Sequence, residues 1–162
     1  MVAENVHFIA LSLGSNLGPS QSLLQQVPLL LQRHGVYNIS KSSIFKTAPV
    51  NCKPGTPPFY NAALVGEYAG GSRELLTLVK RIETEFGRPV KHSSAEARVM
   101  DIDILLFGDC LVREPDLCIP HPRIAERYFV LVPLNEIAPE RTVPGMSKPV
   151  RDLLDDLQAQ TQ

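Results

Sequence analysis

The sequence predicts an α+β fold of the ferredoxin-like, or split βαβ, kind. Segments with strand periodicity and segments with helix periodicity follow one another in the order β-α-β-β-α-β. A length of 162 residues, 44% of them hydrophobic, suits one domain (residues 1–162) with a core of its own. We therefore expect an antiparallel sheet with helices on one face, as a two- or three-layer sandwich with small C-terminal additions.

The first strand and helix are marked by glycine and proline. Residues 6–13 alternate as a strand does and end at a turn that contains Gly14 and Gly18. Pro19 suits the first position of a helix that reaches about His34, with Gly35 as its stop. Pro28 lies inside this helix, so we expect a bend or a break there.

The next two strands are separated by a loop that is rich in proline. Residues 36–46 form a plausible strand, residues 48–58 form the loop, and residues 59–68 form another strand.

A second helix and the last strand of the pattern complete the core. Ser72 is a suitable N-cap for a helix over residues 73–86, which Gly87 ends. An irregular stretch, 88–97, leads to an apolar strand over residues 99–107. The expected additions are an extended piece near 111–112, a short helical turn over 120–126, an apolar segment over 128–134 and a helix over 148–158.

The composition excludes several classes of protein. A net charge of −1 without a basic stripe argues against a nucleic-acid partner. Three cysteines without a CxxC spacing favour a reducing compartment over a disulfide framework or a zinc site. A basic segment followed by an apolar stretch is missing at the N-terminus, and every apolar run is too short to cross a bilayer. We expect a cytoplasmic protein without a membrane partner.

Two acidic residues interrupt the strand over residues 99–107. Asp101 and Asp103 are two apart, so their side chains share one face of the strand at a spacing of about 6.5 Å. Two carboxylates of like charge on an apolar element need a cation, and Mg²⁺ accepts a few carboxylates together with substrate phosphates. The alternative is a pair of acids at a strand end, in water or paired with Arg98.

Other polar residues surround this pair in the sequence. Arg88, Lys91 and Arg98 precede it with His92 among them, and such cations suit a polyphosphate. Glu83 lies on the apolar side of its helix, where its tip either faces the carboxylate strand or reaches water.

Two further groups could contact a ligand. His121 lies between two prolines and, with Arg127, could bind phosphate; each is otherwise an ordinary surface residue. Phe59, Tyr60 and Asn61 could hold a flat heterocycle, with a ring that stacks and an amide that reads its edge, or could serve as core and turn residues.

In their order and spacing, these residues make the chain resemble the 6-hydroxymethyl-7,8-dihydropterin pyrophosphokinase family from about Val6 to Leu157. The matching segments are Leu13–Gly18, Phe45–Thr47 with Pro49, Phe59 with Asn61–Ala63, Arg81–Glu83, Gly87–Arg88, Arg98, Asp101–Gly108, Pro120–Arg123, Arg127 and Phe129.

The resemblance implies an enzyme that transfers pyrophosphate from MgATP to the hydroxymethyl oxygen of the dihydropterin and releases AMP, in folate biosynthesis. It implies two Mg²⁺ ions on Asp101 and Asp103, with Arg88 and Arg98 as further catalytic residues. The implied ATP contacts are Glu83, Arg88, Arg98, Ile104, His121 and Arg127. The implied pterin contacts are Thr47, Ala48, Val50, Phe59, Asn61 and Phe129. We expect a monomer, with residues 48–58 and 88–97 as lids.

The sequence departs from the family pattern in the second of these stretches. Many members carry a basic residue and Trp-Gly-Pro where this chain has Ser94–Ala97. Val90 stands where the family has a further Arg, and neighbouring Lys91 is a candidate substitute. Two other functions remain open: a DxD-type metal-dependent nucleotidyl or glycosyl transferase, and a non-catalytic ferredoxin-like ligand-binding module.

Overall fold

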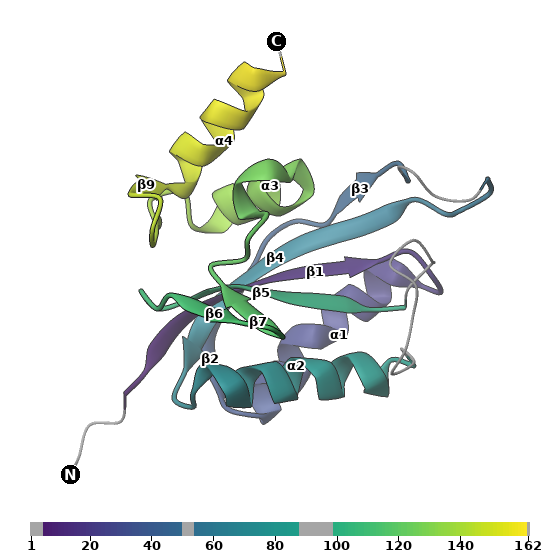
Figure 1. Ribbon diagram of the computed structural model, residues 1–162. Coiled ribbons are helices and arrows are strands. Elements are labelled where there is room, and N and C mark those ends of the chain that lie inside the picture. Colours follow the sequence, from purple (N-terminus) through teal and green to yellow (C-terminus); the bar gives the residue numbers. More distant parts are fainter. Residues whose placement is uncertain (1–4, 50–53, 88–98, 162) are drawn as a thin grey trace.

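The computed structural model describes residues 5–49, 54–87 and 99–161 and has one main sheet with helices on both faces (Figure 1). The order of the strands along the sheet is β2 (Val36–Lys41), β4 (Phe59–Tyr68), β1 (His7–Ser15) and β5 (Asp101–Phe107), and β3 (Phe45–Thr47) also pairs with β4. All of these pairs are antiparallel. The predicted α+β class and the antiparallel sheet are confirmed.

The molecule has three layers, with the main sheet between two pairs of helices and one hydrophobic cluster on each face of the sheet. Ile9, Leu11 and Leu13 of β1 pack on one side with helices α1 (Ser20–Arg33) and α2 (Ser72–Glu85). Ala10, on the other face of β1, packs with helices α3 (Tyr128–Ile137) and α4 (Val150–Gln160). The expectation of helices on one face alone was therefore wrong, and the three-layer arrangement is the one observed.

The first helix has nearly the predicted extent, but Pro19 is its N-cap and not its first residue. Helix α1 is continuous through Pro28, so the helix does not break there. Leu24, Val27 and Leu31 are fully buried on its inner side. We attribute the continuity to this packing, which compensates for the hydrogen bond that proline cannot donate.

The structure has two strands, β2 and β3, where one strand over residues 36–46 was expected. The prediction was wrong for residues 42–44, which lie between the two strands. Ser42 lies between them, and its hydroxyl accepts a hydrogen bond from the Ala63 N–H at 2.8 Å. The backbone N–H of Ser42 in turn donates to the Ala63 carbonyl at 2.9 Å. A side chain thus replaces one backbone acceptor of the ladder, and the strand is interrupted.

The second helix begins one residue earlier than expected. Gly71, and not Ser72, is the N-cap, and its N–H donates to the Glu74 carboxylate at 3.0 Å. Strand β4 has the predicted bounds, whereas β5 begins at Asp101 and not at residue 99.

The C-terminal additions contain more structure than the sequence indicated. Strands β6 (Val112–Glu114) and β7 (Leu117–Ile119) form a hairpin, of which only the first strand was expected. A 3₁₀ turn, η1 (Ile124–Glu126), confirms the predicted short helical turn. Two short strands, β8 (Thr142–Val143) and β9 (Lys148–Pro149), precede α4, and the apolar segment from residue 128 is helix α3.

Candidate active site

The two acidic side chains of β5 face away from α1 and α2. Ile102 and Ile104 are buried in the cluster that contains those helices, so Asp101 and Asp103 point to the opposite face of the sheet. Both residues are half-buried. The shared face that the sequence predicted is confirmed.

Sheet register extends this face toward the middle of the sheet. Asp101 pairs with Gly14 of β1, and Gly14 pairs on its other side with Asn61 of β4. The Asn61 amide lies over Gly14, because a Cβ placed on Gly14 would be 3.3 Å from Asn61 Oδ1. The carboxylate and the amide are thus two strands apart, about 10 Å between Cα atoms, on one surface.

Asn61 is held by a hydrogen bond from the neighbouring strand. The side chain is 5% exposed, and its Nδ2 donates to Thr47 Oγ1 at 3.0 Å. Phe59 lies two residues earlier on β4 and opposite Thr47 in β3, which places it on the same face as Asn61. The structure therefore brings together Thr47, Phe59 and Asn61, three of the predicted pterin contacts.

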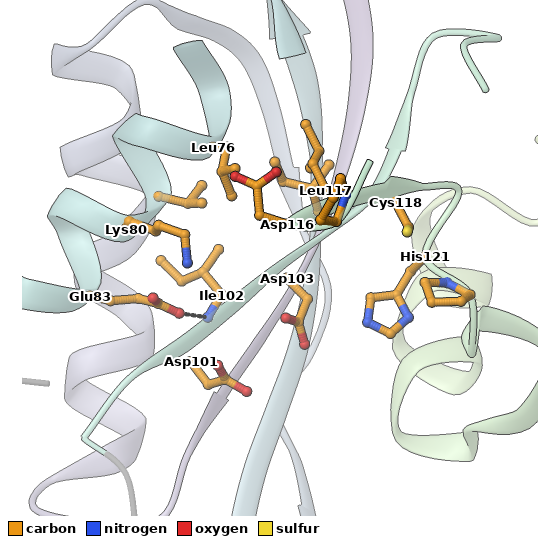
Figure 2. A pocket seen from close by; sticks show the side chains of 14 residues that line it. Leu76, Lys80, Glu83, Asp101, Ile102, Asp103, Asp116, Leu117, Cys118 and His121 are labelled. Atoms are coloured by element: carbon orange, nitrogen blue, oxygen red, sulfur yellow. Dashed lines mark hydrogen bonds between the residues drawn. The ribbon is translucent and has the colours of Figure 1, made fainter. Parts of the chain in front are cut away.

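Glu83 contacts the carboxylate strand directly. Its Oε2 accepts the Ile102 N–H at 2.8 Å, and the residue is 9% exposed (Figure 2). The interpretation in which this side chain reaches water is wrong. Strand β5 is at the edge of the main sheet, and the carboxylate of Glu83 supplies the acceptor that a further strand would provide.

A pocket of about 320 Å³ lies between α2, β5 and the β6–β7 hairpin (Figure 2). Asp101 and Asp103 form its floor, and Glu83 and His121 lie on opposite sides of it. The remaining lining residues are Leu76, Val79, Lys80, Ile102, Ile104, Pro115, Asp116, Leu117, Cys118 and Pro122. Five of the predicted ATP or metal contacts therefore line one pocket: Glu83, Asp101, Asp103, Ile104 and His121.

His121 presents a defined nitrogen to this pocket. The Arg123 N–H donates to His121 Nδ1 at 3.1 Å, which leaves Nε2 as the nitrogen that carries the proton in the neutral ring. Burial, followed by the positive charge of Arg127, lowers the pKa of His121 below 6.5, whereas Asp101 acts in the opposite direction. A neutral imidazole that can donate one hydrogen bond is the result.

Arg127 and Phe129 lie close together at the start of α3. The guanidinium of Arg127 is 5.4 Å from the ring centroid of Phe129, which is 38% exposed. Between them, the Tyr128 hydroxyl donates to the Leu157 carbonyl at 2.9 Å. This hydrogen bond ties the start of α3 to α4 and so fixes the segment that carries both predicted ligand contacts.

Some predicted site residues lie outside the described residues. They are Val50, Arg88 and Arg98, together with Lys91, residues 50–53 of the first expected lid and all of the second. Ala48 is described and is an exposed residue directly after the end of β3.

Sequence reasoning missed Lys80, Asp116 and Cys118 as pocket residues. Lys80 precedes Glu83 by three residues, and this spacing on one helix face could have indicated it. Asp116 and Cys118 come close only because the hairpin folds back over β5, which no local pattern shows.

The carboxylate oxygens of Asp101 and Asp103 fit a hard divalent cation. Within the three described ranges, no group of three His, Cys, Asp or Glu side chains is arranged to bind a metal ion. Two carboxylates without a third side-chain ligand suit Mg²⁺, which keeps positions for water and phosphate oxygens.

Among the described helices, none has the length and apolar character needed to span a membrane.

Comparison with known proteins identifies relatives of this chain. Residues 10–139 match the model of the 7,8-dihydro-6-hydroxymethylpterin-pyrophosphokinase (HPPK) family. The 2-amino-4-hydroxy-6-hydroxymethyldihydropteridine pyrophosphokinase of Bacillus subtilis is 39% identical over 135 residues, which cover 83% of this chain and 78% of that protein. The folate synthesis bifunctional protein of Chlamydia caviae is 39% identical over 139 residues, 83% of this chain but 31% of that protein.

Solved structures agree on the fold. The crystal structure of wild-type Plasmodium falciparum HPPK-DHPS with pteroate has a TM-score of 0.75 and 16% sequence identity, over 99% of this chain and 44% of that one. The same wild-type protein with pterin and p-hydroxybenzoate gives a TM-score of 0.74 at 17% identity. The chain thus spans less than half the length of these bifunctional relatives.

Proposed function

Because the chain belongs to the 7,8-dihydro-6-hydroxymethylpterin-pyrophosphokinase family, we propose that it transfers pyrophosphate from MgATP to 6-hydroxymethyl-7,8-dihydropterin in folate biosynthesis. The observation that carries the proposal is that the matched residues, 10–139, include Asp101 and Asp103, whose side chains share one pocket. The whole reaction of the bifunctional relatives is not proposed for this chain, which spans only part of them.

The reaction exchanges one P–O bond for another. The hydroxymethyl oxygen forms a bond to the β-phosphorus, and the bond from that phosphorus to the α,β-bridging oxygen breaks. AMP leaves with the electron pair, and the hydroxyl proton is lost to solvent or to the phosphate of the departing AMP. Positioning and electrostatic stabilisation supply most of the acceleration in such a transfer.

The residues of the pocket have separate roles in the proposal. Asp101 and Asp103 would hold two Mg²⁺ ions, which would supply positive charge to neutralise the phosphates. His121 donates from Nε2 to a phosphate oxygen, because its Nδ1 already accepts the Arg123 N–H. Glu83 orients β5 through the Ile102 N–H. By resemblance, Arg88 and Arg98 add positive charge beside the phosphates, Arg127 contacts the nucleotide, and Ile104 lies against it.

The pterin occupies the surface that continues from the carboxylates toward β4. Asn61 offers its Oδ1 to the N–H groups of the ring edge, while Thr47 fixes the amide through Nδ2. Phe59 and Phe129 stack on the two faces of the ring. Backbone groups near Ala48 and Val50 complete the contacts that the resemblance implies. This placement brings the hydroxymethyl group toward the carboxylate pair.

The proposal also covers the fold family, the oligomeric state, the location and the partners of the protein. The strand order β2-β4-β1-β5 supports the ferredoxin-like description of the sheet, because the succession β1-α1-β2-β4-α2-β5 follows the βαββαβ pattern when the short strand β3 is left aside. We propose a monomeric, single-domain cytoplasmic enzyme with no nucleic-acid or membrane partner. The family match favours the pyrophosphokinase over both a DxD-type transferase and a ligand-binding module.

A product assay tests the function. Incubation with MgATP and the dihydropterin alcohol should give AMP and pyrophosphorylated pterin in equal amounts. Asp101→Ala and Asp103→Ala should each abolish transfer and leave the circular dichroism spectrum unchanged. The matched control is Asp109→Ala, whose side chain is 91% exposed outside the pocket, and it should keep full activity.

Each contrary outcome identifies a different error. Release of free pyrophosphate in place of AMP would favour the DxD-type transferase. Binding of ATP and pterin without AMP formation would favour a non-catalytic module. Near-normal turnover in either Asp variant would refute the role of the carboxylate pair.

A further inference from the structure

An ion-pair cluster joins the first turn of α2 to the turn of the β6–β7 hairpin. Arg73 donates to both carboxylate oxygens of Asp116, with Nη1 2.7 Å from Oδ2 and Nη2 2.8 Å from Oδ1. Its Nη2 also donates to the Glu114 carboxylate. This paired geometry is the strong form of an arginine–carboxylate contact.

The cluster spans two walls of the nucleotide pocket. Leu76, Lys80 and Glu83 line the pocket from α2, and Asp116 lines it from the hairpin. Arg73 is one turn before Leu76 on the same helix and does not line the pocket itself. It therefore acts on the pocket through Asp116 and not by touching a ligand.

The negative charge of Asp116 would repel the phosphates of the proposed substrate, ATP. Asp116 lines, from the hairpin side, a pocket that would hold a polyanion, and the β5 side of this pocket already carries Asp101 and Asp103 (Figure 2). Hydrogen bonds from Arg73 lower the pKa of Asp116, with a smaller contribution from Lys80, so the group is ionised near neutral pH. The same contacts raise the pKa of Arg73.

We propose that Arg73 is a positioning residue for ATP, which holds the β6–β7 turn against α2 and neutralises the Asp116 carboxylate so that the pocket accepts a polyphosphate. The inference rests on the proposed function, because it assigns the nucleotide to this pocket. What is new is that Arg73, a residue outside the pocket lining, contributes to the affinity for the nucleotide.

The test compares the Michaelis constant for ATP with the turnover number. Arg73→Gln should raise KM for ATP about fivefold, the order of effect expected when one unit of positive charge is lost beside a pocket that binds a polyphosphate. Its kcat should stay within about twofold of wild type, because Arg73 contacts no reacting group. The KM ratio between variant and wild type should fall toward one at high salt, which screens exposed charges.

Second-site variants separate charge from folding. Arg73→Gln with Asp116→Asn should return KM to within about twofold of wild type, because the loss of the Asp116 charge restores the net charge that Arg73, Asp116 and Glu114 have together in wild type. Arg73→Lys keeps the charge and should rescue most of the affinity. Arg151→Gln is the matched control: its side chain has the same 49% exposure and an ion pair with Glu140, but it lies on α4, outside the pocket. It should leave KM unchanged while lowering the melting temperature as little as Arg73→Gln does.

Three results would contradict the proposed role of Arg73. An unchanged KM in Arg73→Gln, an equal rise in Asp116→Asn alone, or a double variant as impaired as the single one would each overturn the proposal. The affinity for a non-hydrolysable ATP analogue should follow the same pattern as KM. A wild-type protein that binds this analogue but forms no AMP would instead refute the proposed function and leave the role of Arg73 to be judged from affinity.

Discussion

Glu83→Ala should destabilise the protein by removing the acceptor at the edge of β5. The Ile102 N–H donates to Glu83 at 2.8 Å in a site where Glu83 is 9% exposed. Loss of a charged acceptor that leaves a buried N–H unpaired costs about 2–3 kcal/mol. For a domain of this size, that free energy corresponds to a fall in melting temperature of roughly 5–10 °C.

Urea denaturation measures this cost and distinguishes it from a loss of charge. Glu83→Ala should lower the midpoint with an unchanged m-value, whereas Glu83→Gln should lose about 1 kcal/mol or less, because an amide oxygen still accepts the N–H. The control is Glu85→Ala, an exposed glutamate on the same helix, which should change stability by no more than about 0.5 kcal/mol.

The same variants should separate in their activity. Ile102 lies between Asp101 and Asp103, so a shift of its backbone displaces both carboxylates. We expect kcat/KM to fall at least tenfold further in Glu83→Ala than in Glu83→Gln, since sub-ångström misplacement is costly in catalysis. Equal stability and equal activity of the Ala and Gln variants would refute the reasoning.

Three further predictions concern the rest of the site. Gly14→Ala should raise KM for the pterin a few-fold with little change in KM for ATP, because the new Cβ would be 3.3 Å from Asn61 Oδ1 and must displace the amide; equal effects on both substrates would contradict this. Tyr128→Phe should cost about 1 kcal/mol of stability by thermal melting, since its hydroxyl donates to the Leu157 carbonyl, and a more stable variant would oppose that role. His121 has a pKa lowered by burial, so the unfolded chain takes up its proton first, and native stability falls as the pH decreases through and below about 6.5. The melting temperature of wild type should therefore drop more between about pH 7 and pH 5 than that of His121→Gln, and parallel curves would exclude the effect.

The sequence predicted those parts of the fold that depend on local periodicity. Helix α2 has its apolar stripe and its N-terminal signal within a few residues, and β4 is bounded by proline and glycine, so both were found within one residue. The break after β2 was not found, because it depends on the Ser42 hydroxyl meeting the Ala63 N–H of another strand. Hydrogen bonds between distant residues have no local pattern.

In the site, too, local patterns were predicted and contacts between distant residues were not. The common face of Asp101 and Asp103 follows from the two-residue period of a strand and was predicted correctly. The contact between Glu83 and Ile102 needs the crossing of α2 over β5, and sequence reasoning left it open. The ion pairs of Arg73 join residues more than forty positions apart and could not be predicted.

The magnesium dependence of nucleotide binding tests the central claim most directly. Calorimetric titration of the wild-type protein with a non-hydrolysable ATP analogue should give an affinity at least about tenfold higher with Mg²⁺ than with EDTA. In a variant that combines Asp101→Asn and Asp103→Asn, Mg²⁺ should make no difference, while Asp109→Asn should behave as wild type. A double variant that keeps the full response to Mg²⁺ would contradict the account, because the cation would then be bound without these two carboxylates.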